Sequence, residues 1–126
     1  MTARRRPCGP VDATARLHDA EAFLEAAETT ADPDVKATNA IHAAIAAADA
    51  ICCAALRERS ADDTHTAATD LLASVDPGLA NHLGRALARK TQAAYESRDI
   101  SASDAAACVR RATTLLAAAR ARILAL

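Results

Sequence analysis

The stretch DPDVKATNAIHAAIAAADAICCAALR, residues 32–57, decides the fold of this chain. It opens with a helix-starting pattern, because Asp32 can cap a helix, Pro33 suits the first turn and Asp34 faces the positive end of the helix dipole. Apolar residues then recur at steps of three and four, at Ile41, Ile45, Ala48, Cys52 and Ala55. These patterns predict one long helix from residue 33 to about residue 57.

Alanine dominates the apolar residues on both sides of this stretch. The 126-residue chain is 52% hydrophobic, yet it has one Phe, one Tyr and no Trp. Because alanine is the best helix former and adds little volume, we expect an almost wholly helical chain whose helices approach closely. No segment alternates β-branched or aromatic residues with polar ones, so we expect no sheet.

Four further helices follow from the same kind of punctuation. We expect them at about residues 12–30, 64–75, 78–97 and 103–125. Asp76 and Pro77 start one of them, and Ser101 with Asp104 forms a capping box for the last. Since short connections between long helices force antiparallel neighbours, the sequence predicts an all-α, up-and-down bundle of four to five helices.

The first eleven residues look different from the rest. Arg4, Arg5 and Arg6 are followed by two prolines and a glycine. This composition predicts a flexible basic arm at residues 1–11, before a single helical domain at residues 12–126. The arginines of such an arm could contact phosphate, although a short basic segment of this kind is commonplace.

The four cysteines are Cys8, Cys52, Cys53 and Cys108. Cys8 falls in the expected arm, and adjacent cysteines point to different sides of a helix, so the spacing fits neither a disulfide framework nor a zinc site. We expect Cys52 and Cys108 to be buried small apolar residues. Because no signal peptide or long unbroken apolar segment is evident, we expect a reducing cytoplasm and no membrane partner. No motif indicates a metal or another cofactor.

Charge is distributed unevenly along the chain. Residues 1–75 hold 7 Lys or Arg and 12 Asp or Glu, whereas residues 76–126 hold 8 and 4. This asymmetry favours either a basic face that contacts the backbone of RNA or DNA, or a self-complementary dimer surface. The charges could also simply mix once the bundle folds. The arginines that could form a basic stripe are Arg85, Arg89, Arg98, Arg110, Arg111, Arg120 and Arg122.

Three segments resemble the HEPN superfamily (higher eukaryotes and prokaryotes nucleotide-binding), especially a small actinobacterial branch. They are NAIHAAIAAADAICC at 39–53, RSADDTHTAATDLL at 59–72 and LARKTQAAYESRDISASDAAACVRRA at 87–112. With the helix order, the resemblance covers most of residues 12–122. It implies a four- or five-helix bundle that usually dimerises and is linked to RNA cleavage, toxin–antitoxin pairs, phage defence or nucleotide handling. Many members of the superfamily are non-catalytic partners.

The same resemblance raises the question of a ribonuclease motif, because active members carry Arg-x4–6-His. Arg59 and His65 have that spacing, but the resemblance places the motif later, where Lys90 and Tyr95 stand. Lysine lacks the planar fork of arginine, and a tyrosine hydroxyl is a poor general base at neutral pH. We therefore interpret Arg59 as capping the end of the second helix and His65 as part of the first turn of the third. A non-catalytic polar site and a divergent ribonuclease remain the alternatives.

Asp49 is the other polar residue that stands out, because nearly all of its sequence neighbours are apolar. A buried carboxylate is costly without a partner. Either Asp49 points to solvent, or it joins an internal polar cluster. The candidate members of that cluster are Asp49, Arg59, His65, Lys90 and Tyr95.

Taken together, these features favour a HEPN-like, homodimeric bundle that acts as a non-catalytic binding or accessory module. Its setting would be beside nucleic acid or within a toxin–antitoxin or defence system, and this setting rests on the resemblance alone. One alternative is a metal-independent endoribonuclease that uses the Arg59 and His65 pair or Lys90 and Tyr95. Another is a purely structural bundle that binds a protein partner.

Overall fold

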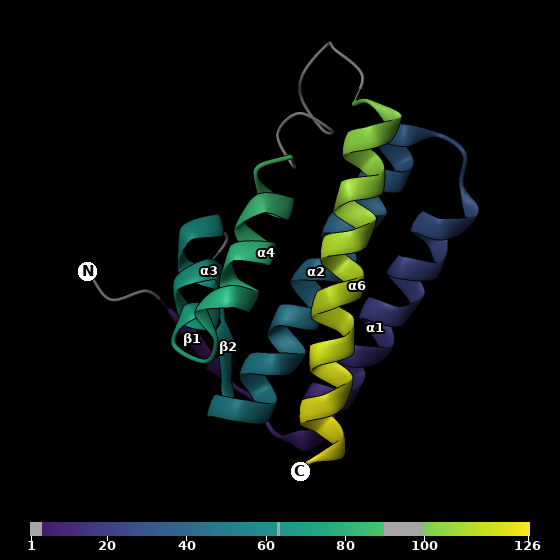
Figure 1. The fold of residues 1–126 in the computed structure, drawn as a ribbon. Helices are drawn as coiled ribbons and strands as arrows, with labels where there is room; N and C mark the ends of the chain where they lie inside the picture. Colours follow the sequence, from purple (N-terminus) through teal and green to yellow (C-terminus); the bar gives the residue numbers. More distant parts are fainter. Residues whose placement is uncertain (1–3, 63, 90–99) are drawn as a thin grey trace.

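The structure, a computed structural model, describes residues 4–62, 64–89 and 100–126. These residues form five helices packed antiparallel, together with a small two-stranded sheet (Figure 1). The elements are β1 (Arg5–Pro7), α1 (Pro10–Thr29), α2 (Pro33–Leu56), β2 (Glu58–Ser60), α3 (His65–Ala73), α4 (Pro77–Leu87) and α6 (Ala102–Leu124). The expected helical bundle is confirmed.

Side chains cap four of the helices at their first turns. Asp32 accepts hydrogen bonds from the backbone N–H groups of residues 34 and 35, at 2.9 and 3.1 Å. Asp76 and Ser101 each accept one from the residue three positions further on, at 3.1 and 3.0 Å. Thr64 does the same for α3 at 3.3 Å. The helix starts expected from Asp32, Asp76 and Ser101 are therefore confirmed, because capping is a local property of the sequence.

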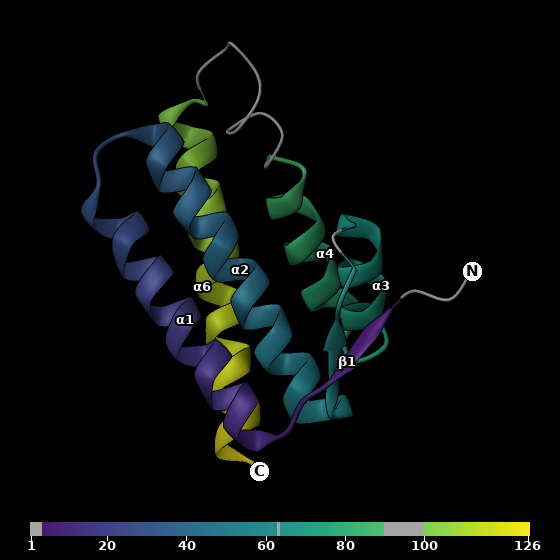
Figure 2. The ribbon, with the colours of Figure 1, turned by 180° about the vertical axis from the view of Figure 1, so that it is seen from behind.

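Helix α2 is the central element of the bundle. It contacts α1, α3, α4 and α6, and Figure 2 shows it running beside α1 with α6 behind. Half of its 24 residues are buried, most of them alanines. A helix that is apolar on several faces fits this central position, since each face packs against a different neighbour.

The length and composition of α2 would also allow it to cross a membrane. The buried core helix of a soluble bundle meets the same criterion, and most of the apolar part of α2 is buried here. The length and composition of α2 therefore fit both a buried core helix and a membrane-spanning helix. The expected cytoplasmic location stays a prediction.

Residues that the sequence led us to expect in a flexible arm are instead held against the bundle. β1 pairs antiparallel with β2, with Arg6 opposite Arg59 in the register. Two backbone hydrogen bonds extend this pairing, from Cys8 N–H to the Arg57 carbonyl and from Ala61 N–H to the carbonyl of Arg4, both at 3.0 Å. Helix α1 begins directly afterwards, at residue 10. The expectation that no strand forms is therefore wrong for these two segments.

A disulfide between Cys8 and Cys53 fixes the same region. The two Cα atoms lie 5.4 Å apart, across a sequence separation of 45 residues. The expectation of no disulfide is wrong, because antiparallel packing brings the start of α1 and the end of α2 to the same end of the bundle. Cys52 and Cys108 are free and buried, as expected.

Helix α4 ends earlier than the sequence led us to expect. Its last turn tightens after Leu87, where the Arg89 N–H donates to the carbonyl of Ala86 at 3.1 Å. The remainder of the expected helix, with the candidate residues Lys90 and Tyr95, lies outside the described residues.

Candidate functional site

Asp49 is the centre of a polar cluster that joins three elements. Its side chain, on α2, is 15% exposed. Arg16 of α1 donates to Asp49 Oδ2 from Nη2 at 3.0 Å and from Nε at 3.2 Å. Arg59 of β2 donates to the same oxygen from Nη1 at 3.4 Å. The two expectations left open for Asp49 are thereby decided in favour of an internal cluster.

Burial and the two arginines act on this carboxyl in opposite directions. Desolvation raises the pKa of Asp49 above its ordinary value of 3.8 and is the largest influence. The positive charges and hydrogen bonds of Arg16 and Arg59 work against that rise. Arg16 also pairs with Asp19 at 2.8 Å, so two arginines are matched by two carboxylates within the cluster. The cluster is charge-balanced and ties α1, α2 and β2 together.

Arg59 belongs to this cluster, but its role differs from the one we expected. The C-cap residue of α2 is Arg57, which adopts a left-handed backbone with φ of 59° and donates its N–H to the Cys53 carbonyl. Arg59 lies in β2 and uses its guanidinium on Asp49. The interpretation of Arg59 as a helix cap is therefore wrong, because the chain turns into β2 before this side chain can reach the helix end.

The other candidate members of the cluster are not joined to it by the described contacts. His65 is the first residue of α3, as expected, and its side chain lies outside what the structure describes. Lys90 and Tyr95 also lie outside the described residues. Of the candidate partners of Asp49, only Arg59 is therefore shown in place.

Arg16 is the member of the cluster that the sequence analysis missed. A signal was available, because residues at similar distances from the turn at 30–32 face each other in an antiparallel pair of helices. Arg16 and Asp49 satisfy that condition. The spacing alone would not have distinguished Arg16 from neighbouring polar residues of α1.

The space beside Asp49 is too small for a ligand. The cavity between α2, β2 and α3 has a volume of about 10 Å³ and is lined in part by Cys52 and Ser60. The Ser60 hydroxyl is buried without a hydrogen-bond partner there. A volume of this size admits at most about one water molecule. Burial, aided by the negative charge of Asp49, raises the pKa of the neighbouring Cys52 thiol to about 12. The polar cluster around Asp49 therefore has a structural role, in which it holds α1, α2 and β2 together.

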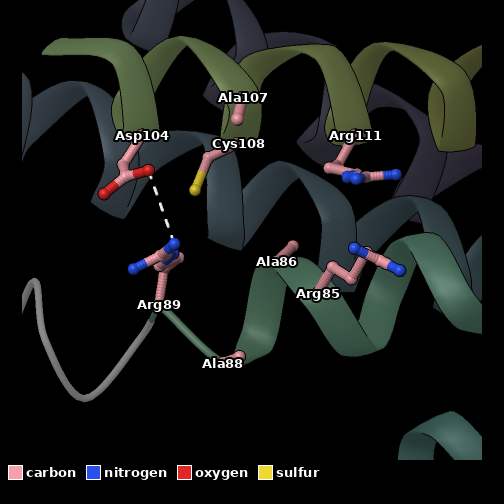
Figure 3. A pocket seen from close by; sticks show the side chains of 8 residues that line it. All are labelled: Arg85, Ala86, Ala88, Arg89, Asp104, Ala107, Cys108 and Arg111. Atoms are coloured by element: carbon pink, nitrogen blue, oxygen red, sulfur yellow. Dashed lines mark ion pairs between the residues drawn. The ribbon is translucent and has the colours of Figure 1, made fainter. Parts of the chain in front are cut away.

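A larger pocket lies between α4 and α6, with a volume of about 270 Å³. Arg85 enters it from α4 and Arg89 from the turn just after α4, while Arg111 and Asp104 enter it from α6 (Figure 3). Arg85 and Arg111 extend toward one end of the pocket, whereas Arg89 reaches Asp104 at the other end. The described lining therefore holds three guanidinium groups and one carboxylate.

The arginines of this pocket differ in how they are held. Arg111 Nη1 donates to His82 Nδ1 at 3.0 Å, which requires that ring nitrogen to be the acceptor. Arg85 Nε donates to the Asn81 side-chain oxygen at 3.4 Å. Arg89 Nη2 lies 3.4 Å from Asp104 Oδ1. The first two contacts fix arginines with neutral acceptors, so they leave the guanidinium charges available to an anion.

Cys108 lies at the floor of the pocket and is 2% exposed. Burial raises the pKa of its thiol above the ordinary value of 9.0, and Arg89 works against that rise. A thiol that keeps its proton is a poor nucleophile. The walls are otherwise formed by alanines, so the described lining is suited to holding an anion and offers no strong base.

The pocket gathers part of the basic stripe that the sequence led us to consider. Arg120 instead pairs with Glu21 of α1 at 3.6 Å, which takes it to another side of α6. Arg110 is exposed outside the pocket lining, and Arg98 lies outside the described residues. Of the arginines in the expected stripe, Arg85, Arg89 and Arg111 therefore meet at this pocket. Within the described residues, no group of three or more His, Cys, Asp or Glu side chains is arranged to hold a metal ion.

No protein-family model matches this sequence, and no curated protein is detectably similar to it.

Proposed function

We propose that this chain is a non-catalytic helical binding module of the HEPN type, which contacts the phosphate backbone of RNA or DNA through the pocket between α4 and α6. The observation that carries the proposal is the meeting of Arg85, Arg89 and Arg111 at one pocket. Arginine binds phosphate oxygens through a planar fork of donors, and neutralising a phosphate releases counterions from the nucleic acid.

The polar cluster supports the non-catalytic part of the proposal. In a ribonuclease with the Arg-x4–6-His motif, the arginine would hold the scissile phosphate. Here the Arg59 side chain is 25% exposed and is paired with Asp49, which lines a cavity of about 10 Å³. An RNA phosphate would have to displace a carboxylate to reach it. Homodimerisation and a role in a toxin–antitoxin or defence system are carried by the resemblance, and they belong to the same proposal.

Fluorescence anisotropy with labelled RNA and DNA strands tests the proposal directly. We expect binding at low salt that weakens as salt rises, without dependence on base sequence. Replacing Arg85 and Arg111 by glutamine should weaken binding and reduce the slope of log K against log salt by about one for each phosphate that is no longer neutralised. Arg120→Gln makes a matched change on α6 outside the pocket and should leave binding nearly unchanged.

Two results would overturn the proposal. One is an absence of binding to either nucleic acid at low salt, and the other is an equal loss for the pocket variant and for Arg120→Gln. The ribonuclease alternative is tested in the same samples by following the length of the RNA. Cleavage that is abolished by His65→Ala would show that the module is an enzyme.

A further inference from the structure

We infer that the pocket between α4 and α6 binds the terminal phosphomonoester of a nucleic-acid strand in preference to an internal phosphodiester. This inference rests on the proposed function and names the ligand group of the same site. It follows from the concentration of charge in one hollow, from the partners of the three arginines, and from the size and lining of the space.

The charge of the pocket matches a dianion better than a monoanion. Arg85, Arg89 and Arg111 surround one space of about 270 Å³, together with the single carboxylate of Asp104. A backbone that lies across a flat face offers one negative charge to each basic side chain in turn. A terminal phosphate carries about −1.5 to −2 charges at neutral pH, whereas an internal phosphodiester carries about −1. Three arginines against one carboxylate among the described lining residues therefore favour the terminal group.

Two of the arginines are set in place without being neutralised. Arg111 is held by the His82 ring at 3.0 Å, and Arg85 by the Asn81 amide oxygen at 3.4 Å. Among the described residues, neither arginine has a carboxylate partner in an ion pair. A guanidinium that is oriented by a neutral acceptor keeps its remaining N–H donors for a phosphate oxygen.

Asp104 competes with any incoming anion for Arg89. Its Oδ1 lies 3.4 Å from Arg89 Nη2, and the two side chains are 34% and 44% exposed. This separation is longer than that of a strong charge-assisted hydrogen bond, about 2.7–2.9 Å. An incoming anion must compete with the carboxylate for Arg89, and its own charge is repelled by Asp104. A dianion gains more from three arginines than a monoanion does, so it competes more effectively.

The remaining described residues of the lining offer no means of reading the base. The pocket is smaller than the roughly 300–1,000 Å³ of sites that enclose drug-sized ligands. Apart from the four charged side chains and Cys108, the described part of its lining is alanine, at Ala86, Ala88 and Ala107. Among the described lining residues there is no aromatic ring that could stack on a base. A phosphate group with its adjoining sugar fits this space, and the base would remain outside.

Anisotropy with one strand in three forms tests the inference. The strand carries an internal label and ends in a 5′-phosphate, a 3′-phosphate or hydroxyl groups at both ends. We expect one phosphorylated form to bind at least about tenfold more tightly than the hydroxyl form, since hydrogen bonds to charged groups contribute about 1.5–3 kcal/mol. Which of the two forms gains identifies the end of the strand that the pocket holds.

Variants show whether the preference belongs to this pocket. The double variant Arg85→Gln with Arg111→Gln should bind all three forms alike, while Arg120→Gln should keep the preference. Asp104→Asn should tighten binding of the preferred form by about twofold to fivefold, because it removes the competing charge. A gain of affinity cannot come from loss of folding, and circular dichroism checks the double variant.

The outcomes separate the inference from the proposed function. Equal binding of the three forms, lowered equally by the double variant, would overturn the inference and leave backbone binding in place. Binding of a phosphorylated form alone would support the inference and overturn general backbone contact. No binding of any form would overturn both.

Discussion

Asp49 shows how one charged residue is accommodated in an alanine-rich bundle. Its carboxylate is largely buried on α2, and it accepts hydrogen bonds from Arg16 and Arg59, which come from α1 and β2. Burial penalises the ionised form, and the two guanidinium groups compensate for part of that penalty. Asp49 thus links α1, α2 and β2 through its ion pairs and is not a free acidic group.

The raised pKa of Asp49 predicts a pH dependence of stability. The folded protein takes up a proton on Asp49 at a higher pH than the unfolded chain does. Between those two pKa values the folded state binds more protons, so the free energy of unfolding falls as pH rises through this window. Asp49→Asn cannot titrate. In urea unfolding above about pH 4, the stability of the wild type relative to Asp49→Asn should therefore decrease with rising pH, then level off.

A matched control is Asp19→Asn, which removes the other carboxylate on Arg16 from a side chain that is 52% exposed. Wild type and this variant should differ little across the same pH range. An increase of wild-type stability relative to Asp49→Asn with rising pH would contradict the prediction. It would mean that the arginines outweigh desolvation at this carboxyl.

At the scale of the elements, α2 organises the bundle through the small size of its side chains. It contacts all four of the other described helices, and Ala44, Ala46 and Ala47 are completely buried. Tight packing of this kind leaves little room for extra atoms, since protein interiors are as dense as crystals of small organic molecules. The alanine content of the sequence is therefore a structural requirement at these positions.

Enlarging one of these alanines should destabilise the bundle. Ala47→Leu adds a branched side chain where the wild-type residue has no exposed surface. We expect it to lower the free energy of unfolding by about 1–3 kcal/mol, as overpacked cores do. Ala26→Leu makes the same change at an exposed position of α1 and should have little effect. Urea unfolding of the two variants measures the difference, and equal stabilities would show that α2 has room to spare.

The elements also show how far the sequence could be interpreted. Helix starts at Asp32, Asp76 and Ser101 were predictable, because a cap involves residues two or three positions apart. The pairing of β1 with β2 was not, because it joins segments more than fifty residues apart that carry no strand-forming pattern. The disulfide could in principle have been predicted from the sequence, since antiparallel helices bring Cys8 and Cys53 to the same end of the bundle.

The candidate sites follow the same division. The apolar neighbours of Asp49 identified it as a residue in need of a partner, and Arg59 was among the candidates. Arg85, Arg89 and Arg111 could be named from the sequence as basic residues, but their meeting depends on how α4 packs against α6. Spacing along one helix predicts a stripe, whereas the pocket requires the arrangement of two helices.

At the scale of the whole molecule, the acidic and the basic parts of the chain have different roles in the fold. The acidic first part supplies Asp49 and Glu21, which hold arginines in ion pairs, while the basic second part supplies the pocket. The Cys8–Cys53 disulfide closes one end of the bundle and joins residues 4–9 to the end of α2. The molecule therefore has one end that is held by the disulfide, and a separate basic pocket between α4 and α6.

Counting reactive thiols tests this arrangement of the whole chain. In the folded protein we expect no rapid reaction with a thiol reagent, because Cys52 and Cys108 are 3% and 2% exposed. After unfolding without reductant two thiols should react, and after reduction all four cysteines should react. Cys8→Ser serves as the control, since it should expose three thiols without reductant. Four reactive thiols in unreduced, unfolded wild type would show that the disulfide does not form.

The burial of Cys52 has a consequence for the lifetime of the disulfide next to it. Exchange of one disulfide for another begins when a thiolate attacks a sulfur of the existing bond. Cys52 is the sequence neighbour of Cys53, yet its pKa of about 12 keeps it protonated at neutral pH. The Cys52 thiol is therefore a poor attacking group for as long as the chain stays folded. Scrambling of the bond should require unfolding first, so the native pairing is protected by the packing of α2 itself.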